Sequence, residues 1–138
     1  MKTFVTLIFF CLITVVGSAQ VTEYSIDKKL KKCLDSSQNY TTSGIIGCEY
    51  QAYEDWDKEL NRNYKLLMTA LDAEGKAKLK AAQISWLSFR DSNFSFIKDI
   101  YGKKQGTMWR PVEVDEKVEI VKGRAIELKK YCELLKLY

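Results

Sequence analysis

The stretch IIGCEYQAYEDWDKELNRNYKLLMTAL, residues 45–71, decides the fold class of this chain. Its apolar side chains recur at steps of three or four over about seven turns of an α-helix, which places them on one face. Because such a face has to be buried against other elements, the stretch predicts a long amphipathic helix within a multi-helix domain. The side chains of this face belong to Ile45, Cys48, Ala52, Trp56, Leu60, Tyr64, Leu67 and Leu71.

Three further stretches carry helical periodicity, and strand patterns are weak throughout. A short helix is expected over 26–34, before the Thr-Thr-Ser-Gly break at 41–44. Asp72 can cap a third helix, and Pro111 suits the first turn of a last one. We therefore predict an all-α protein, a small four-helix bundle-like domain with a disulfide-closed loop near its N-terminus.

The first 19 residues have the layout of a secretory signal peptide. Lys2 is followed by an apolar run from Phe4 to Val16 and then by the small residues at 17–19. An uncleaved anchor is the alternative, although the run is short for a membrane span. We expect cleavage after Ala19, export to the periplasm or the medium, no stable membrane anchor after cleavage, and a single domain over 20–138.

Composition argues against several classes of function. The chain has no histidine, and without Lys2 its charge is 21 minus 18, or +3, which together with export argues against nucleic-acid binding. The absence of histidine removes the commonest metal ligand and general base. Asp57 and Asp91 could in principle transfer protons, but a nearby arginine would hold both ionised. We expect no enzymatic activity, no metal and no cofactor.

Three cysteines remain after cleavage: Cys33, Cys48 and Cys132. Export permits disulfides, and three cysteines allow three pairings, each of which leaves one thiol free. Cys33 and Cys48 enclose a polar stretch typical of a loop, and a bridge between them would stabilise the fold by about 3 kcal/mol. Cys132 lies on the apolar face of the last helix. We expect a Cys33–Cys48 disulfide and a buried free thiol.

Polar side chains interrupt the apolar faces of the last three helices. A buried, unpaired guanidinium costs several kcal/mol, so arginines on these faces need carboxylate partners. We favour a structural network in which Asp57 pairs with Arg90 or Arg124, so that Arg90→Ala would destabilise the fold by about 3 kcal/mol or more. The alternative is a polar ligand groove between the helices. The proposed network comprises Asp57, Asn61, Tyr64, Gln83, Trp86, Arg90, Asp91 and Arg124.

The same positions resemble a known family, the LprI-like lysozyme inhibitors. The similarity is carried by the Cys33 and Cys48 pair, Tyr53, DKELNRNY (57–64), AQISWLSFRD (82–91) and RAIEL (124–128). Members commonly have two further cysteines, at positions where this chain has Phe94 and about Glu116, so one disulfide would be missing and packing of Phe94 could replace it. The resemblance implies a small exported helical protein that binds a lysozyme or another cell-wall hydrolase.

The segment GKKQGTMWR, residues 102–110, is the candidate partner-binding loop. A cationic side chain on a protruding loop suits a cleft whose working groups are two carboxylates, and apolar anchors would add contact. An ordinary solvated loop is the alternative. The candidate residues are Lys103, Lys104, Met108, Trp109 and Arg110.

A second function remains open: a binding module, without inhibitory activity, for an envelope protein or an anionic cell-wall polymer. Lysines at 76, 78, 80, 98, 103 and 104 favour the polymer, although they are also typical of a solubilising surface.

The charge of the chain bears on binding to a lysozyme. Animal-type lysozymes are themselves basic, so the positive net charge of this chain gives no long-range attraction to them. The acidic run at 49–59 could instead provide a local docking face. The sequence leaves the oligomeric state open.

Overall fold

A computed structural model of the chain describes residues 24–138, and the predicted signal peptide lies outside the described residues. No strand occurs in this part of the chain, and none of its helices is long and apolar enough to cross a membrane. The all-α prediction is therefore confirmed. The elements are α1 (Ser25–Leu34), the short 3-10 helix η1 (Ser37–Asn39), α2 (Thr42–Ala70), α3 (Ala73–Gly102) and α4 (Trp109–Leu134).

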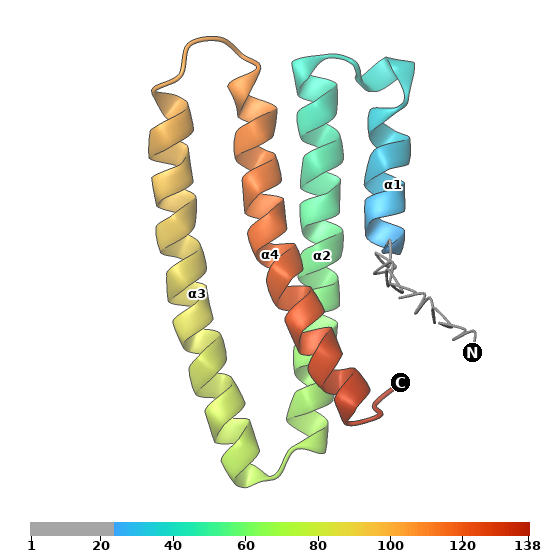
Figure 1. Ribbon diagram of the computed structural model, residues 1–138, viewed down its shortest axis with the longest axis vertical. Helices are drawn as coiled ribbons and strands as arrows, with labels where there is room; N and C mark the ends of the chain where they lie inside the picture. The colour runs from blue at the N-terminus through green and yellow to red at the C-terminus, as the bar shows by residue number, and fades with distance from the viewer. Residues whose placement is uncertain (1–23) are drawn as a thin grey trace, which may run out of the picture.

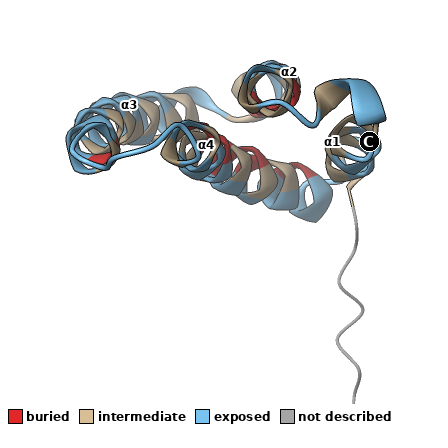
Figure 2. Ribbon diagram, turned by 90° about the horizontal axis from the view of Figure 1, so that it is seen from above, coloured by how far each residue is buried: buried red, intermediate tan, exposed pale blue. Residues whose placement is uncertain are grey.

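The three long helices stand side by side, with the short α1 against α2 (Figure 1). Seen from above, α4 lies between α3 and α2, and α1 lies at the opposite edge from α3 (Figure 2). The helices thus form a curved, bundle-like layer, and most of their mutual contact is between α2 and α4.

The hydrophobic core runs along the seam between α2 and α4, where the two predicted apolar faces meet. Trp56 and Leu60 are buried from α2, opposite Val121 and Leu128 from α4. Burying each such side chain stabilises the fold by about 1.5–3 kcal/mol. Tyr24 extends the core towards α1 through an edge-to-face contact with Trp56, with ring centroids 5.4 Å apart.

Side-chain caps start two of the helices. The Thr41 hydroxyl accepts a hydrogen bond from the Gly44 amide at 3.1 Å at the start of α2. Asp72 accepts one from the Gly75 amide at 2.8 Å and begins α3, as predicted. Pro111 lies in the first turn of α4, also as predicted, where its missing N–H leaves no intrahelical bond unmade.

A disulfide joins Cys33 of α1 to Cys48 of α2, with their Cα atoms 5.8 Å apart. It closes the segment that contains η1 and fixes α1 against α2. Cys132 is a buried free thiol in α4, so both expectations for these cysteines are confirmed.

The predicted apolar face of α3 is much less buried than its periodicity indicates. Ile97 is the buried residue of this helix, whereas Ala82 on the same face is exposed, as are Phe89 and Phe96 on a flank. The reason is its position at the edge of the layer: α3 packs along α4, and it meets α2 only slightly (Figure 2).

Candidate functional site

A cavity of about 440 Å³ lies between α2 and α3, and we call it the α2–α3 groove. It brings together six of the eight residues predicted to form a polar network, and Asp91 and Arg124 lie beside it. The groove is lined by Asp57, Leu60, Asn61 and Tyr64 from α2 and by Lys80, Gln83, Ile84, Trp86, Leu87 and Arg90 from α3. These polar residues therefore line an open groove and are not sealed within a core.

The predicted pairing of Asp57 with an arginine is wrong. Arg90 donates from Nε at 2.8 Å and from Nη2 at 2.7 Å to Asp91, the next residue of its own helix. Asp57 accepts instead from Asn61 Nδ2, at 2.9 Å on Oδ2 and 2.8 Å on its carbonyl oxygen. Arg90 therefore has a carboxylate partner on its own helix and needs none from α2. Its side chain is partly exposed, so solvent also reaches it.

Arg124 also finds a partner within its own helix. Its Nη1 donates to Glu127 Oε2 at 2.7 Å, and its Nε donates to Gln83 Oε1 of α3 at 3.1 Å. The residue is only 8% exposed, and its Nη2 is buried without a partner in the described part of the chain. The guanidinium groups of Arg90 and Arg124 lie over the Trp86 ring, at 5.5 and 5.9 Å, as cation–π contacts.

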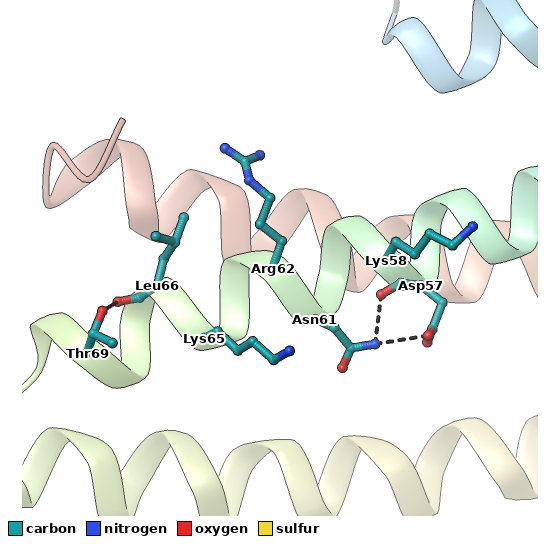
Figure 3. Close-up of a pocket in the computed structure, with 7 residues that line it drawn as sticks. All are labelled: Asp57, Lys58, Asn61, Arg62, Lys65, Leu66 and Thr69. Carbon is teal, nitrogen blue, oxygen red and sulfur yellow. Dashed lines mark hydrogen bonds between the residues drawn. The ribbon is translucent and has the colours of Figure 1, made fainter.

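A second, shallower depression of about 630 Å³ adjoins the groove on α2, and we call it the α2 hollow. It shares Asp57 and Asn61 with the groove, and Figure 3 shows Asn61 between Asp57 and Lys65 along the helix. Its remaining lining residues are Lys58, Arg62, Lys65, Leu66 and Thr69.

The candidate partner-binding loop encloses a cavity of about 470 Å³ at the α3–α4 connection, and we call it the loop cavity. Lys104, Trp109 and Arg110 line it, together with Lys98 and Tyr101. The Trp109 ring lies 6.1 Å from the Tyr101 ring, and Lys104 Nζ lies 5.5 Å from the Trp109 centroid. Trp109 is thus a half-buried wall of the cavity and does not project from the loop.

The other two loop candidates lie outside the cavity lining. Lys103 forms an ion pair with Asp99 at 2.6 Å, one helical turn earlier, and Met108 is 66% exposed. Three of the five predicted residues therefore form part of the cavity wall, namely Lys104, Trp109 and Arg110, and the other two, Lys103 and Met108, face solvent.

The acidic side chains in and beside the loop cavity are already engaged. Glu113, which lines the cavity, accepts a hydrogen bond from Lys117 at 2.5 Å. Glu116 accepts one from the Tyr101 hydroxyl, which raises the pKa of that tyrosine. Within residues 24–138, no ion pair involves Lys98, Lys104 or Arg110. In addition, α4 begins here without a capping side chain or an acid in its first turn, so its positive end adds to the field. The loop cavity is positively charged.

Sequence reasoning missed two buried polar residues of α2. Glu49 is 5% exposed, and burial, followed by the charges of Asp115 and Glu119, raises its pKa to about 7. Asn63 is fully buried and donates to the Ala125 carbonyl oxygen of α4 at 3.2 Å. Glu49 lies seven residues before Trp56, hence on the inward face, and that spacing was the available signal. The acidic run at 49–59 is therefore not one continuous solvent-facing surface.

The family described as lysozyme inhibitor LprI matches residues 33–128, which is most of the chain. The chain belongs to the LprI lysozyme-inhibitor family. The match spans the disulfide, the residues of the α2–α3 groove, the loop cavity and Arg124. Among the described residues, no group of three or more Cys, Asp or Glu side chains could hold a metal ion.

A solved structure shares the fold of this LprI-family protein. The crystal structure of an uncharacterised protein from Burkholderia thailandensis matches with a TM-score of 0.75 and 25% sequence identity. The match covers 80% of this chain and 54% of that one, so the chain spans about half the length of its structural relative. No curated protein matches this sequence.

Two side chains fasten α3 at or near the positions where the resemblance predicts further cysteines. Phe94 packs against the core and faces Tyr53, with centroids 6.1 Å apart. Glu116 of α4 accepts a hydrogen bond from the hydroxyl of Tyr101, which lies near the end of α3. Packing at one position and a hydrogen bond at the other thus anchor the end of α3.

Proposed function

We propose that this LprI-family protein is an exported, non-enzymatic inhibitor that binds a lysozyme or another muramidase and blocks its cleft. The observation that carries the proposal is the loop cavity, whose Lys104 and Arg110 have no acidic partner in the described residues and flank Trp109. A muramidase cleft works through two carboxyl groups, which are natural partners for such cations. Close charge pairs across protein–protein interfaces have favourable coupling energies in double-mutant cycles.

The shape of the molecule supports this mode of binding. The α3–α4 connection lies at one end of the layer, so it can approach a cleft while the helices stay outside (Figure 1). Gly106 adopts a φ of 92°, which allows the loop to turn sharply there. The Tyr101 hydrogen bond to Glu116 and the Tyr101–Trp109 contact hold the base of the loop before binding, which reduces the entropy lost on association.

Inhibition can be measured with the exported form, residues 20–138, titrated against several lysozyme types at physiological salt. A small soluble oligosaccharide substrate should be used, so that the readout does not depend on cell walls. We expect saturable inhibition of one type, and its loss in the double variant Lys104→Gln with Arg110→Gln. Lys130→Gln is the matched control, because Lys130 is an exposed lysine of α4 outside the loop cavity.

Two outcomes contradict the proposal in different ways. Absence of inhibition of every type, up to roughly tens of micromolar, would reject the function itself. Inhibition that the double variant retains in full would reject the loop as the blocking element and direct attention to the other surfaces.

A further inference from the structure

We infer that the α2–α3 groove is a carbohydrate site that binds a strand of N-acetylated amino sugars. This binding does not require a muramidase, so the inference goes beyond the proposed inhibition.

The groove and the α2 hollow have the dimensions of a ligand site. Their volumes of about 440 and 630 Å³ fall in the range of roughly 300–1,000 Å³ that small-molecule sites occupy. Because they share Asp57 and Asn61, the two depressions meet at this pair. An elongated ligand can lie in both at once, as a chain of sugars would.

The polar groups at this junction are paired in a way that leaves both acceptors and donors available. Asn61 Nδ2 is bound to Asp57 Oδ2, which leaves Asp57 Oδ1 and Asn61 Oδ1 as acceptors for hydroxyl groups. Gln83 Oε1 is bound to Arg124, which leaves the Gln83 Nε2 amide to donate to an acetamido carbonyl oxygen. Sugar rings with N-acetyl groups present both kinds of partner.

Apolar side chains of α3 complete the groove. Ile84 is 59% exposed and Leu87 is 36% exposed, and both line the groove opposite Leu60 and Tyr64. The C–H faces of pyranose rings and the acetamido methyl groups are apolar, so these side chains give them a surface on which to pack. The Trp86 ring already has the guanidinium groups of Arg90 and Arg124 over it, so this role falls to Tyr64, Ile84 and Leu87.

The charge of the groove favours a neutral ligand over a polyanion. Of its two cations, Arg90 is bound to Asp91, and Asp57 offsets the charge of Lys80. The α2 hollow adds three cations, of which Lys65 is the one without an ion pair in residues 24–138. A nucleic acid or a phosphate-rich polymer would therefore find less attraction here than at the loop cavity, where three cations have no ion pair.

The test is a titration of isotopically labelled protein with the N-acetylglucosamine tetramer, in the absence of any muramidase. We expect saturable chemical-shift changes at the side-chain amides of Asn61 and Gln83, little affected by added salt because no ion pair forms. Leu87→Ala and Asn61→Ala should each weaken binding by about fivefold to tenfold. Ile100→Ala is the matched control, because Ile100 is 40% exposed on the same helix and lines neither depression.

The competing outcomes are distinct. No shift changes at saturating tetramer, changes confined to 103–110, or equal weakening by Ile100→Ala would overturn the groove as a sugar site. Equal binding of a glucose tetramer would overturn recognition of the N-acetyl group. Sugar binding without inhibition would refute the proposed function alone, and inhibition without sugar binding would refute this inference alone.

Discussion

Arg124 of α4 donates from Nε to the side-chain oxygen of Gln83 in α3, 3.1 Å away. This bond joins the outer helix to the core through two polar side chains. Apolar burial of α3 is partial: Ile97 is its one buried residue, and Leu79, Trp86 and Phe94 are partly buried against the core. The position of α3, and with it the width of the α2–α3 groove, therefore depends on polar contacts to α4 as well as on hydrophobic packing.

Gln83→Leu should lower the free energy of unfolding by about 1–3 kcal/mol, because the buried Nε of Arg124 would lose its acceptor. The same guanidinium already has one buried nitrogen without a partner in the described chain, so the substitution would leave two. Urea unfolding measures the change. Gln38→Leu, at an exposed glutamine of η1, is the control and should change stability by less than about 0.5 kcal/mol. An equally small effect at Gln83 would contradict the role of this bond.

The two arginines of the groove region should differ in how much they stabilise the fold, and Arg90 should contribute less than the sequence suggested. Arg124→Ala should cost about 3 kcal/mol, because it removes a buried side chain from beside Trp86 and leaves Gln83 without its donor. Arg90→Ala should cost only about 1 kcal/mol, since its partner Asp91 is exposed and stays solvated. Thermal or urea unfolding of both variants gives the order. A larger loss for Arg90 would show that its contacts over Trp86 and Phe94 matter more than burial of Arg124.

Helical periodicity predicted which face of each helix points inward, but it could not predict how many neighbours that face would have. For α2 and α4 the predicted faces are buried, because each helix lies against the other, and Trp56 and Leu128 are buried as expected. For α3 the predicted face is only partly buried, because the helix lies at the edge of the layer, and Ala82 on that face is exposed.

Polar partners were harder to predict than faces. Arg90 lies on the expected face, but its guanidinium pairs with Asp91, the next residue of α3, and not with an acid of α2. The loop was predicted from its cations and its indole, yet the direction of Trp109 depends on α4 starting at that residue, which places its ring beside Tyr101.

Glu49 should make the protein more stable at pH 4.5 than at pH 8. Its pKa is raised from 4.5 to about 7 in the folded state, so the folded protein holds a proton that the unfolded chain releases in this window. Stability contributed by the protonated form is complete below about pH 4.5 and is lost as the pH rises towards 7. A shift of this size corresponds to at most about 3 kcal/mol.

Glu49→Gln keeps the shape of the side chain and removes the titration. We expect the variant to match the wild type at pH 4.5 and to exceed it at pH 8 by about 1–3 kcal/mol in urea unfolding. Glu54→Gln, at an exposed position of the same helix, should leave the pH dependence unchanged. A Glu49→Gln variant that keeps the wild-type loss of stability between these pH values would assign that loss to other groups, such as Asp115, whose pKa burial also raises.

Two glycines near the start of α2 should respond to alanine in opposite directions. A Cβ on Gly44 would lie 2.6 Å from the Cα of Asn39, and Asn39 cannot easily retreat because its side chain bonds the Cys33 carbonyl oxygen at 2.9 Å. Gly44→Ala should therefore destabilise the fold by about 1–3 kcal/mol. At Gly47 a Cβ would meet nothing within 4 Å, so Gly47→Ala should stabilise it by about 0.5–1 kcal/mol through helix propensity. Unfolding curves of the two variants that shift in the same direction would contradict the close approach at Gly44.

Cys132 should resist thiol reagents until the protein unfolds. Its side chain is buried, its Sγ lies 3.5 Å from the Asn63 carbonyl oxygen, and burial raises the pKa of the thiol. The reactive thiolate is thus both scarce and covered. In non-reducing buffer we expect no labelling of a protein that comprises residues 20–138 at pH 8 and complete labelling of one thiol in denaturant, because Cys33 and Cys48 are bonded to each other. After reduction, loss of the bridge should lower stability by about 3 kcal/mol, so that Cys132 becomes labelled at a lower urea concentration. Rapid labelling of the native, oxidised protein would mean that the C-terminal end of α4 opens without global unfolding.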